Sequence, residues 1–497
     1  MRMKTEKHRL LLLSLLLGFL LLCLGGCAAR TGPEEPDASA GAGIPEARRV
    51  ILLQGGSADC EAEGVSISGS EIVIGEPGEY ELRGTLNNGR ILVQTGQNAG
   101  DVTLVLNGAH LRCEDGPAIE EQQAGKLILV LQEGTENSVH SGGEKAPAPD
   151  PDAVGAAILA EDALALEGTG SLKVEGFLNN GIAGKKELSI LGGALQIHAS
   201  NCGVSVAKFV EILDGNIQIT AGNDGLRTHS DKVAGKGDIS ISGGDLKLQA
   251  AGDGISAEGT LTVSGGCLDI STEGDPEIVS SKGVKAQKDA VITGGELTVT
   301  SRDNAVHSKG DLLVSGGSLK LRAENGKGMM AGGTLRLEGD AELDVAAAGN
   351  GIETDTDLIV SGGNLRVTSG GDGLRAGDSG TGKGIFRMEG GTVYVSAAND
   401  ALDAKIGMSV SGGNLFAAGS SYRLKSFSPD SAQASLCAEL AESAEGQITV
   451  CTREGTVLDT LGLDVPARTV HYSSPALKRG ESYELHSGSG TASAVAG

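Results

Sequence analysis

Apolar and polar residues alternate with a period of two along many short segments, and glycine or asparagine separates these segments. Such alternation predicts β-strands whose side chains point to opposite faces in turn. The segment Lys126–Leu131 is apolar after its first residue, which predicts a buried strand. The strands predicted before it are Val65–Ile67, Glu71–Ile74, Glu79–Leu82, Ile91–Val93 and Val102–Leu106.

Two short phrases recur in the same order along the chain. The first is Asn-Asp-Gly-Leu-Arg-Thr at 223–228, and the second is Ser-Gly-Gly-Asp-Leu at 242–246. The pair returns about every 22 residues, or about every 28 where a few residues are inserted, and this period is typical of a repeat protein. Each copy is too small to bury its own apolar face, so neighbouring copies must stack.

The aligned repeats form columns. The position before the turn glycine varies and holds Asn180, Cys202, Asp224, Asp253, Lys282, Asn304, Lys327, Asn350, Asp372 and Asp400. Two residues later the column is apolar throughout, with Ile182, Val204, Leu226, Ile255, Val284, Val306, Met329, Ile352, Leu374 and Leu402. Alternate positions that point inward in register predict a parallel coil with an aliphatic interior.

We therefore predict an all-β fold, a right-handed parallel β-helix of about 22-residue coils. A calcium-binding β-roll is rejected, because its repeat of about nine residues is far shorter. The predicted parts are a signal peptide (1–26), a flexible tether (27–50), an N-terminal strand region (51–153), the β-helix (154–426) and a small antiparallel, sandwich-like C-terminal domain (427–497). The strands on either side of the helix are expected to cover its open ends.

Composition supports this fold and limits the ligand. Of 497 residues 79 are glycine, only 2% are aromatic and none is Trp. Glycine at this level without a triplet period excludes collagen and fits a chain that turns every few residues. Sugar rings of a neutral polymer normally stack on aromatic faces, so this composition favours an acidic polymer over crystalline cellulose.

The N-terminus has the features of an export signal. Four basic residues precede an apolar run from Leu10 to Leu24, which is too short for an ordinary membrane-spanning helix. The run ends in Leu-Gly-Gly-Cys, which resembles the lipobox of bacterial lipoproteins, where the cysteine is acylated. Cys27 is therefore the predicted lipidation site, and the protein is expected to be extracytoplasmic, anchored to the membrane on the bacterial cell surface. A plain secretory signal is the alternative.

The formal net charge of -25 makes nucleic acid an improbable partner, because both would be polyanions. An acidic surface suits a protein that recruits divalent cations, although solubility alone also explains it. The cysteines lack the spacing and histidine partners of a zinc site. Cys437 and Cys451 have the option of a disulfide between neighbouring strands, which spacing does not establish. The oligomeric state is likewise open.

Acidic residues at the turn column suggest a calcium site. Asp224 and Asp253 are predicted to lie one coil apart, as are Asp372 and Asp400. Carboxylates stacked at about 4.8 Å repel each other unless one is protonated or a cation lies between them. Calcium binds such carboxylates together with backbone carbonyls. Further oxygen ligands are expected from Asn223, Asn399, Asp303 and Asp403. The alternative is that Asp and Asn are there because they favour turns.

A second inward column, of mostly small residues, lies four positions after the turn column, and the column between the two inward ones is predicted to face outward. It holds Arg227, Lys285 and Arg375, whose cationic groups would pair with uronate carboxylates. The alternative is that these charges belong to a solvated face without function.

Several phrases together resemble a known family. They are Leu-Asn-Gly at 106–108, Glu-Gly-Thr-Glu-Asn at 133–137, Asn-Asn-Gly-Ile at 179–182, the repeated Asp-Gly-Leu and Ser-Gly-Gly, and Ser-Ser-Pro-Ala-Leu-Lys at 473–478. In order and spacing they resemble bacterial carbohydrate-binding β-helix proteins of the pectate-lyase-like superfamily. The resemblance implies a surface protein that binds polygalacturonate, and cellulose as a further option, with calcium and without cleavage. Cys202, Lys282 and Lys327 depart from the acidic turns of that family.

The sequence thus predicts calcium-assisted binding of an acidic polysaccharide. Two alternatives stay open. A calcium-dependent polysaccharide lyase would need a basic residue such as Arg227 or Arg375 to remove a proton beside the uronate carboxylate. An adhesin or structural surface protein would need neither. A repetitive face suits a repetitive ligand better than a single catalytic point does.

Overall fold

The computed structural model describes residues 49–96, 100–143, 155–229, 237–377, 382–421, 423–488 and 490–497. These residues belong to one compact unit that extends to Gly497. The predicted signal peptide, Cys27 and the tether up to residue 48 lie outside the described residues. The last two residues assigned to the tether, Arg49 and Val50, begin strand β1 (Arg49–Gly55). Within the described part, all regular structure is β-strand, and no helix has the length and apolar character needed to cross a lipid bilayer.

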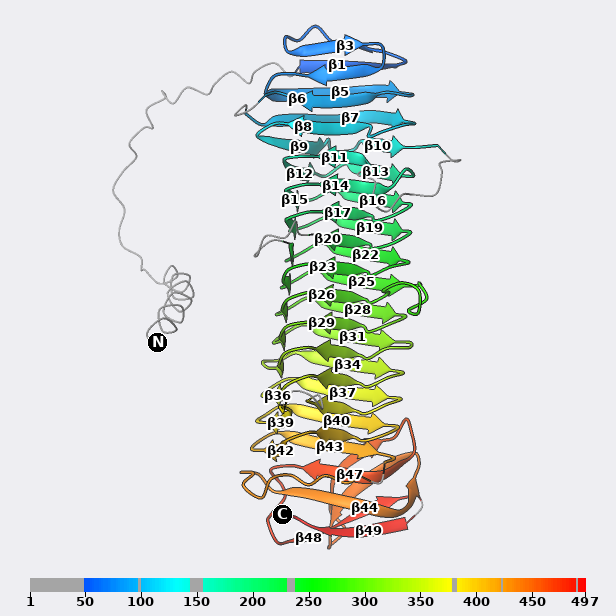
Figure 1. Ribbon diagram of the computed structural model, residues 1–497. Coiled ribbons are helices and arrows are strands. Elements are labelled where there is room, and N and C mark those ends of the chain that lie inside the picture. The colour runs from blue at the N-terminus through cyan, green and yellow to red at the C-terminus, as the bar shows by residue number, and fades with distance from the viewer. Residues whose placement is uncertain are drawn as a thin grey trace, which may run out of the picture. The chain divides into compact units, whose positions relative to one another are not determined.

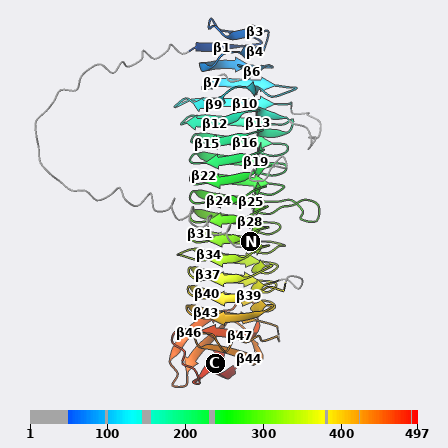
Figure 2. The same ribbon diagram turned by 60° about the vertical axis from the view of Figure 1, so that its left-hand side comes forward.

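The described unit is a parallel β-solenoid of about 13 turns, as the repeat predicted (Figures 1 and 2). Each regular coil contributes one strand to each of three ladders. We call them the turn-column ladder, the short-strand ladder and the long-strand ladder, after the strands that they contain.

The turn-column ladder is a 15-stranded sheet that carries the aligned apolar column. Its strands are β3 (Val65–Ser68), β4 (Glu71–Ile74), β6 (Arg90–Gln94), β8 (Ile119–Gln123), β11 (Ala156–Ala160), β14 (Asn180–Gly184), β17 (Val204–Val206), β20 (Leu226–Thr228), β23 (Ile255–Ala257), β26 (Val284–Ala286), β29 (Val306–Ser308), β32 (Met329–Ala331), β35 (Ile352–Thr354), β38 (Leu374–Ala376) and β41 (Leu402–Ala404).

In each regular coil, a strand of the short-strand ladder follows the strand of the turn-column ladder. Its members are β9 (Lys126–Leu131), β12 (Ala163–Gly168), β15 (Glu187–Ile190), β18 (Phe209–Ile212), β21 (Asp238–Ile241), β24 (Leu261–Val263), β27 (Ala290–Ile292), β30 (Leu312–Val314), β33 (Leu335–Leu337), β36 (Leu358–Val360), β39 (Ile385–Met388) and β42 (Gly407–Val410).

The long-strand ladder begins after the Ser-Gly-Gly phrase. Its members are β10 (Glu136–Ser141), β13 (Ser171–Gly176), β16 (Ala194–Ala199), β19 (Asn216–Ala221), β22 (Asp245–Ala250), β25 (Cys267–Thr272), β28 (Glu296–Ser301), β31 (Ser318–Ala323), β34 (Glu342–Ala347), β37 (Asn364–Ser369), β40 (Thr392–Ala397) and β43 (Asn414–Gly419).

The structure confirms that the residues of the predicted apolar column pair in register from one coil to the next. Leu226 pairs with Val204 in the coil before it and with Ile255 in the coil after it, and the pairing continues to Leu402. These side chains are buried in one continuous aliphatic cluster that extends from Ile51 to Phe427. A residue such as Ile255 therefore contacts the coils on both sides, and stacking buries what a single coil leaves exposed.

The parallel pairing begins earlier than the predicted boundary at residue 154. β6 already pairs in parallel with β8, and β5 (Gly78–Leu86) pairs in parallel with β7 (Val102–Cys113). β7 is long enough to pair with both β9 and β10, so the short-strand and long-strand ladders diverge from it. The N-terminal edge is covered by the antiparallel pairs β1–β2 (Ala58–Asp59) and β3–β4.

The C-terminal end is closed by antiparallel strands, as predicted. β47 (Ala467–Ser473) pairs antiparallel with β43, the last long strand, and with β44 (Ser435–Ala444). Beyond them, β45 (Gln447–Thr452), β46 (Val457–Gly462), β48 (Ser482–Ser487) and β49 (Gly490–Val495) form a 4-stranded sheet. Cys437 and Cys451 lie in β44 and β45, which do not pair, and both are free thiols. The disulfide that the spacing left open is therefore not formed between these two strands.

Candidate functional site

The residues of the turn column form a hydrogen-bonded ladder along the solenoid. Asp224 Oδ1 accepts from the backbone N–H of Asp253 at 2.8 Å, and Asp253 Oδ1 accepts from that of Lys282 at 2.9 Å. Asparagine does the same, because Asn350 Oδ1 accepts from the backbone N–H of Asp372 at 2.8 Å. This contact requires a side-chain oxygen and no charge, which explains why either Asp or Asn can make it.

The first predicted pair, Asp224 and Asp253, has basic partners from the same face. Lys285 Nζ lies 2.8 Å from Asp253 Oδ2, and Arg227 Nε lies 3.8 Å from Asp224 Oδ2. Ser280 also donates to Asp253 Oδ1 at 2.7 Å. Burial, and then the charge of Asp253, raises the pKa of Asp224 to about 6.

The second predicted pair, Asp372 and Asp400, lies near the end of the solenoid. Asp372 Oδ1 accepts from Asn399 Nδ2 at 2.6 Å and from the backbone N–H of Asp400 at 3.2 Å. Burial, and then the charge of Asp400, raises the pKa of Asp372. Asp400 is 2% exposed, and neither of its carboxylate oxygens accepts a hydrogen bond within the described residues. Arg423 Nη2 approaches Asp400 Oδ2 to 2.8 Å.

The remaining predicted ligands are held by other contacts. Asp303 pairs with Lys282, and Asn223 Nδ2 donates to Asn201 Oδ1 at 3.1 Å. Burial opposes ionisation of Asp403, but the hydrogen bond from Lys425 and the nearby cations outweigh it and lower the pKa of Asp403.

The eight predicted calcium ligands therefore do not come together at one point. Within the described ranges, no three or more His, Cys, Asp or Glu side chains are arranged as a metal centre. Asp253 does not fit a resident calcium ion, because a backbone amide, a hydroxyl and an ammonium group already occupy its oxygens. Among the described residues, Asp400 fits better but only in part, since its buried Oδ1 has no donor whereas Oδ2 is ion-paired with Arg423 at 2.8 Å.

The predicted carbohydrate-binding cations are also engaged inside the protein. Lys285 is only 19% exposed and pairs with Asp253. Arg375 lies 4.0 Å from Asp372 and 3.9 Å from Asp403. The sequence places these side chains on the correct strands, but the structure gives each of them an acidic partner.

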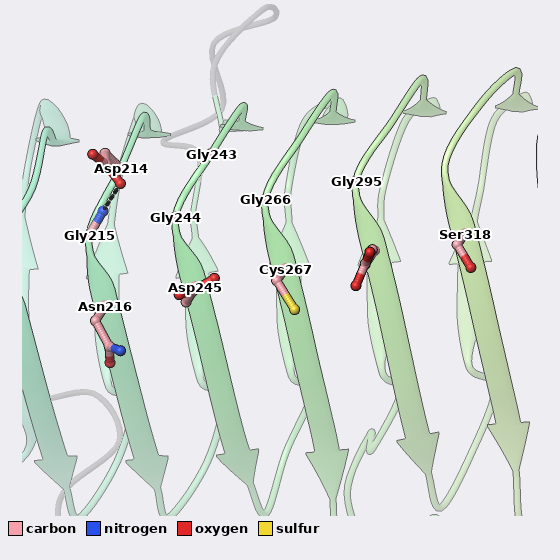
Figure 3. A pocket seen from close by; sticks show the side chains of 11 residues that line it. Asp214, Gly215, Asn216, Gly243, Gly244, Asp245, Gly266, Cys267, Gly295 and Ser318 are labelled. Carbon is pink, nitrogen blue, oxygen red and sulfur yellow. Dashed lines mark hydrogen bonds between the residues drawn. The ribbon is translucent and has the colours of Figure 1, made fainter.

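A furrow that sequence reasoning missed lies at another corner of the solenoid, where the Ser-Gly-Gly phrases stack (Figure 3). A Cβ on Gly265 would lie 2.3 Å from the carbonyl oxygen of Ser242 in the preceding coil. The next residue, Gly266, has a φ of 88°. Gly265 is therefore required because a side chain has no space there, and Gly266 because its backbone conformation favours glycine. The turns cannot carry side chains, and a floor of backbone results.

Polar side chains border this floor. Figure 3 shows the first residues of neighbouring long strands in a row beside the glycine turns. These are the exposed residues Asn216, Asp245, Cys267, Glu296 and Ser318, with Asp214 before the first of them. An adjoining groove shares Ser318 with it and crosses β31, β34, β37 and β40, past Lys320, Asp344, Arg366 and Tyr394; we use the word furrow for the two together. It therefore runs along the solenoid across the strands and crosses many coils.

The furrow differs from the turn column in that its charged side chains are not paired with one another. Lys320, Asp344 and Arg366 are exposed and follow one another in register. Among the described residues, none of the three has an ion-pair or hydrogen-bond partner for its side chain, whereas Arg227, Lys285 and Arg375 are paired. Cations without an internal partner are available to a ligand. The signal for this site in the sequence is the variable polar residue after each Ser-Gly-Gly.

Fold and site together define a β-solenoid with a long, polar, solvent-exposed furrow. The model of the family described as carbohydrate-binding domain-containing protein matches residues 68–326 and 308–459. The chain belongs to this family.

The chain is also similar to one relative and to one solved structure. A carbohydrate-binding domain-containing protein of Acetivibrio thermocellus is 29% identical over 181 residues, which is 36% of this chain and 61% of the relative. The chain thus matches less than two thirds of that relative's length. A polysaccharide lyase-like protein from C. thermocellum, solved as a gadolinium derivative, is 24% identical, with a TM-score of 0.39 over 60% of this chain and 97% of that protein. A TM-score this low supports no argument.

Proposed function

We propose that this protein binds a polysaccharide along the furrow without cleaving it. The observation that supports this most is the length of the furrow, which extends from Asp214 to Tyr394 across successive coils. Each coil adds one residue to each row of side chains along the furrow, so these rows repeat with the strand spacing of about 4.8 Å. A site that repeats along one axis matches a ligand that repeats along one axis. The family to which the chain belongs supports a carbohydrate as that ligand.

We propose an acidic polysaccharide of the plant cell wall, such as polygalacturonate, as the ligand. Lys320 and Arg366 are exposed cations without partners among the described residues, and they would receive uronate carboxylates. Tyr394 is the aromatic residue of the furrow, and it is half-buried. This is little aromatic surface for the flat rings of cellulose, which remains the less favoured ligand.

We propose that calcium binds at two locations on the protein. The first half of the furrow carries Asp214, Asp245 and Glu296, which would repel a polyanion. Calcium ions bridging these carboxylates to uronate groups would turn repulsion into binding. The second place is Asp400, whose buried Oδ1 has no donor among the described residues and whose Oδ2 an ion would share with Arg423, with Asp372 one coil before it. An ion there would stabilise the fold and would not contact the polymer.

We further propose that the protein is an extracytoplasmic lipoprotein, acylated at Cys27 and anchored to the bacterial membrane. The lipobox-like Leu-Gly-Gly-Cys supports this. The test is metabolic labelling with a fatty acid. Label should enter the wild-type protein and be lost in Cys27→Ser, which should also leave the membrane fraction. Equal labelling of both would contradict the assignment.

Binding is tested by affinity electrophoresis in gels that contain polygalacturonate, a neutral glucan or no polymer, each with calcium or with a chelator. We expect retardation by polygalacturonate, strongest with calcium. Equal mobility in all gels would overturn the proposal and favour an adhesin or a structural role. Release of unsaturated oligouronides, detected by their ultraviolet absorbance, would favour the lyase alternative.

A further inference from the structure

The long-strand ladder is exposed over most of its length and covered at one end. Outward positions are exposed or half-buried from β19 to β37, as in Asp245, Lys247 and Gln249 of β22. In β43 the pattern changes, since the outward residues Phe416 and Ala418 are 0% exposed. Both pack into the apolar core of the C-terminal strands. A ligand on this ladder therefore has free surface only on the N-terminal side of β40, along the strands that come before it.

The C-terminal strands are fastened to the face of the ladder by specific polar contacts. Tyr394 Oη lies 3.3 Å from the carboxylate oxygens of Asp459. Thr368 Oγ1 donates to Asp464 Oδ2 at 2.7 Å, and Ser396 Oγ accepts from the backbone N–H of Asp464 at 3.1 Å. These contacts fix the segment around Asp464 on the outward side of β37 and β40. The furrow that passes Lys320 and Arg366 thus meets a wall at Tyr394.

A second hollow lies beside this wall. It has a volume of about 480 Å³, and Val465 borders it together with Arg322, Thr368 and Gly370. The furrow and the hollow therefore both meet the same C-terminal segment. A polymer that follows the furrow toward Tyr394 has no straight path beyond the wall. A continuing chain would have to turn away from the ladder at this point, whereas a chain end can lie straight up to the wall.

We propose that the furrow recognises the end of the polysaccharide chain, with the terminal sugar residue against the wall at Tyr394. This inference rests on the proposed function and adds to it the part of the polymer that is bound. Arg366 is the last unpaired cation before the wall and would hold the carboxylate of the terminal uronate. Side-chain hydroxyls of Thr392 and the Tyr394–Asp459 pair would face its hydroxyl groups.

The experiment compares two matched variants with a short ligand. Arg366→Gln removes the cation next to the wall. Lys247→Gln removes a cation from the same outward column five strands earlier, about 24 Å away at about 4.8 Å per strand. Both side chains are exposed, so both variants should unfold at the wild-type temperature. Binding of trigalacturonate and of polygalacturonate, with calcium present, is measured by titration calorimetry.

Chain-end recognition predicts one trimer per protein, with affinity reduced roughly tenfold in Arg366→Gln and unchanged in Lys247→Gln. It also predicts that fragmenting the polymer at constant mass increases the bound protein in proportion to the number of ends. Several trimers per protein, equal effects of the two variants, or capacity independent of the number of ends would each overturn it. Binding of the polymer without the trimer would do so too, while leaving the proposed function intact. No binding of either ligand overturns the proposed function, and chain-end recognition with it.

Discussion

Replacing Asp224 by Asn should stabilise the protein at neutral pH. The pKa of Asp224 is raised from 3.8 to about 6, so between these values the folded state holds a proton that the unfolded state has released. Stability therefore falls as pH rises through this window, because the folded state binds more protons than the unfolded one. Each unit of pKa corresponds to about 1.4 kcal/mol, so the ionised carboxylate costs about 3 kcal/mol above pH 6.

Asparagine keeps the one contact that the ladder requires. Its Oδ1 can still accept from the backbone N–H of Asp253, as Asn350 does for Asp372. The new amide N–H₂ faces Arg227, which offers no acceptor, and this costs about 1 kcal/mol. The net expectation for Asp224→Asn is a gain of about 2 kcal/mol at pH 8, and no gain below about pH 4, where the wild-type carboxyl is also neutral.

The matched control is Asp253→Asn, one coil further along. Asp253 is 2% exposed and pairs with Lys285, which is 19% exposed, so neutralising Asp253 removes the ion-pair partner of a largely buried ammonium group. This should cost roughly 3 kcal/mol. Thermal and urea unfolding from pH 4 to 8, with a chelator present, compare the two variants with the wild type. The reasoning is refuted if Asp224→Asn is destabilised at pH 8, or if its effect does not change with pH.

Three further predictions address the turns, the furrow and calcium. Gly265→Ala should lower the unfolding temperature, because its Cβ would collide with the carbonyl of Ser242; Gly446→Ala, whose added Cβ meets no atom within 4 Å, tests strain from positive φ alone and should cost less. In affinity electrophoresis, Lys320→Gln should weaken polygalacturonate binding roughly tenfold, whereas Arg227→Gln should not change it. If Arg227→Gln weakens binding and Lys320→Gln does not, the polymer binds at the turn column and not in the furrow. Calcium should raise the unfolding temperature of the wild type but not of Asp400→Asn, and an equal shift in both would place the ion elsewhere.

The sequence predicted the repeat well because the fold repeats the same physical requirement in every coil. A single inward position such as Leu226 must be apolar in each copy, so its column is visible without a structure. The Ser-Gly-Gly turn is visible for the same reason, since stacked turns exclude side chains. The antiparallel C-terminal strands were also predicted, from the loss of the repeat and the change in alternation.

The site was harder to predict, because partners from neighbouring coils decide which charges are free. Lys285 was expected to face solvent, but it reaches back to Asp253. Asp403 pairs with Lys425, which follows the last repeat and belongs to no column. The furrow residues follow the glycine turns, but they vary from coil to coil, as exposed side chains do, and nothing in its residue type separates Glu296 from an ordinary surface residue. One feature of the sequence indicates that the C-terminal end of the long-strand ladder is covered, namely that the outward positions Phe416 and Ala418 are apolar.

The central claim, that the polymer lies in the furrow, is tested most directly with Cys267. Its thiol is exposed at the border of the furrow, whereas the other five cysteines of the described part are buried or half-buried. The rate at which a maleimide labels Cys267 is measured by mass spectrometry, with and without polygalacturonate, in the presence of calcium. The account predicts that the polymer slows labelling and that a bulky adduct at Cys267 abolishes binding. Unchanged labelling at a polymer concentration that saturates binding would contradict it.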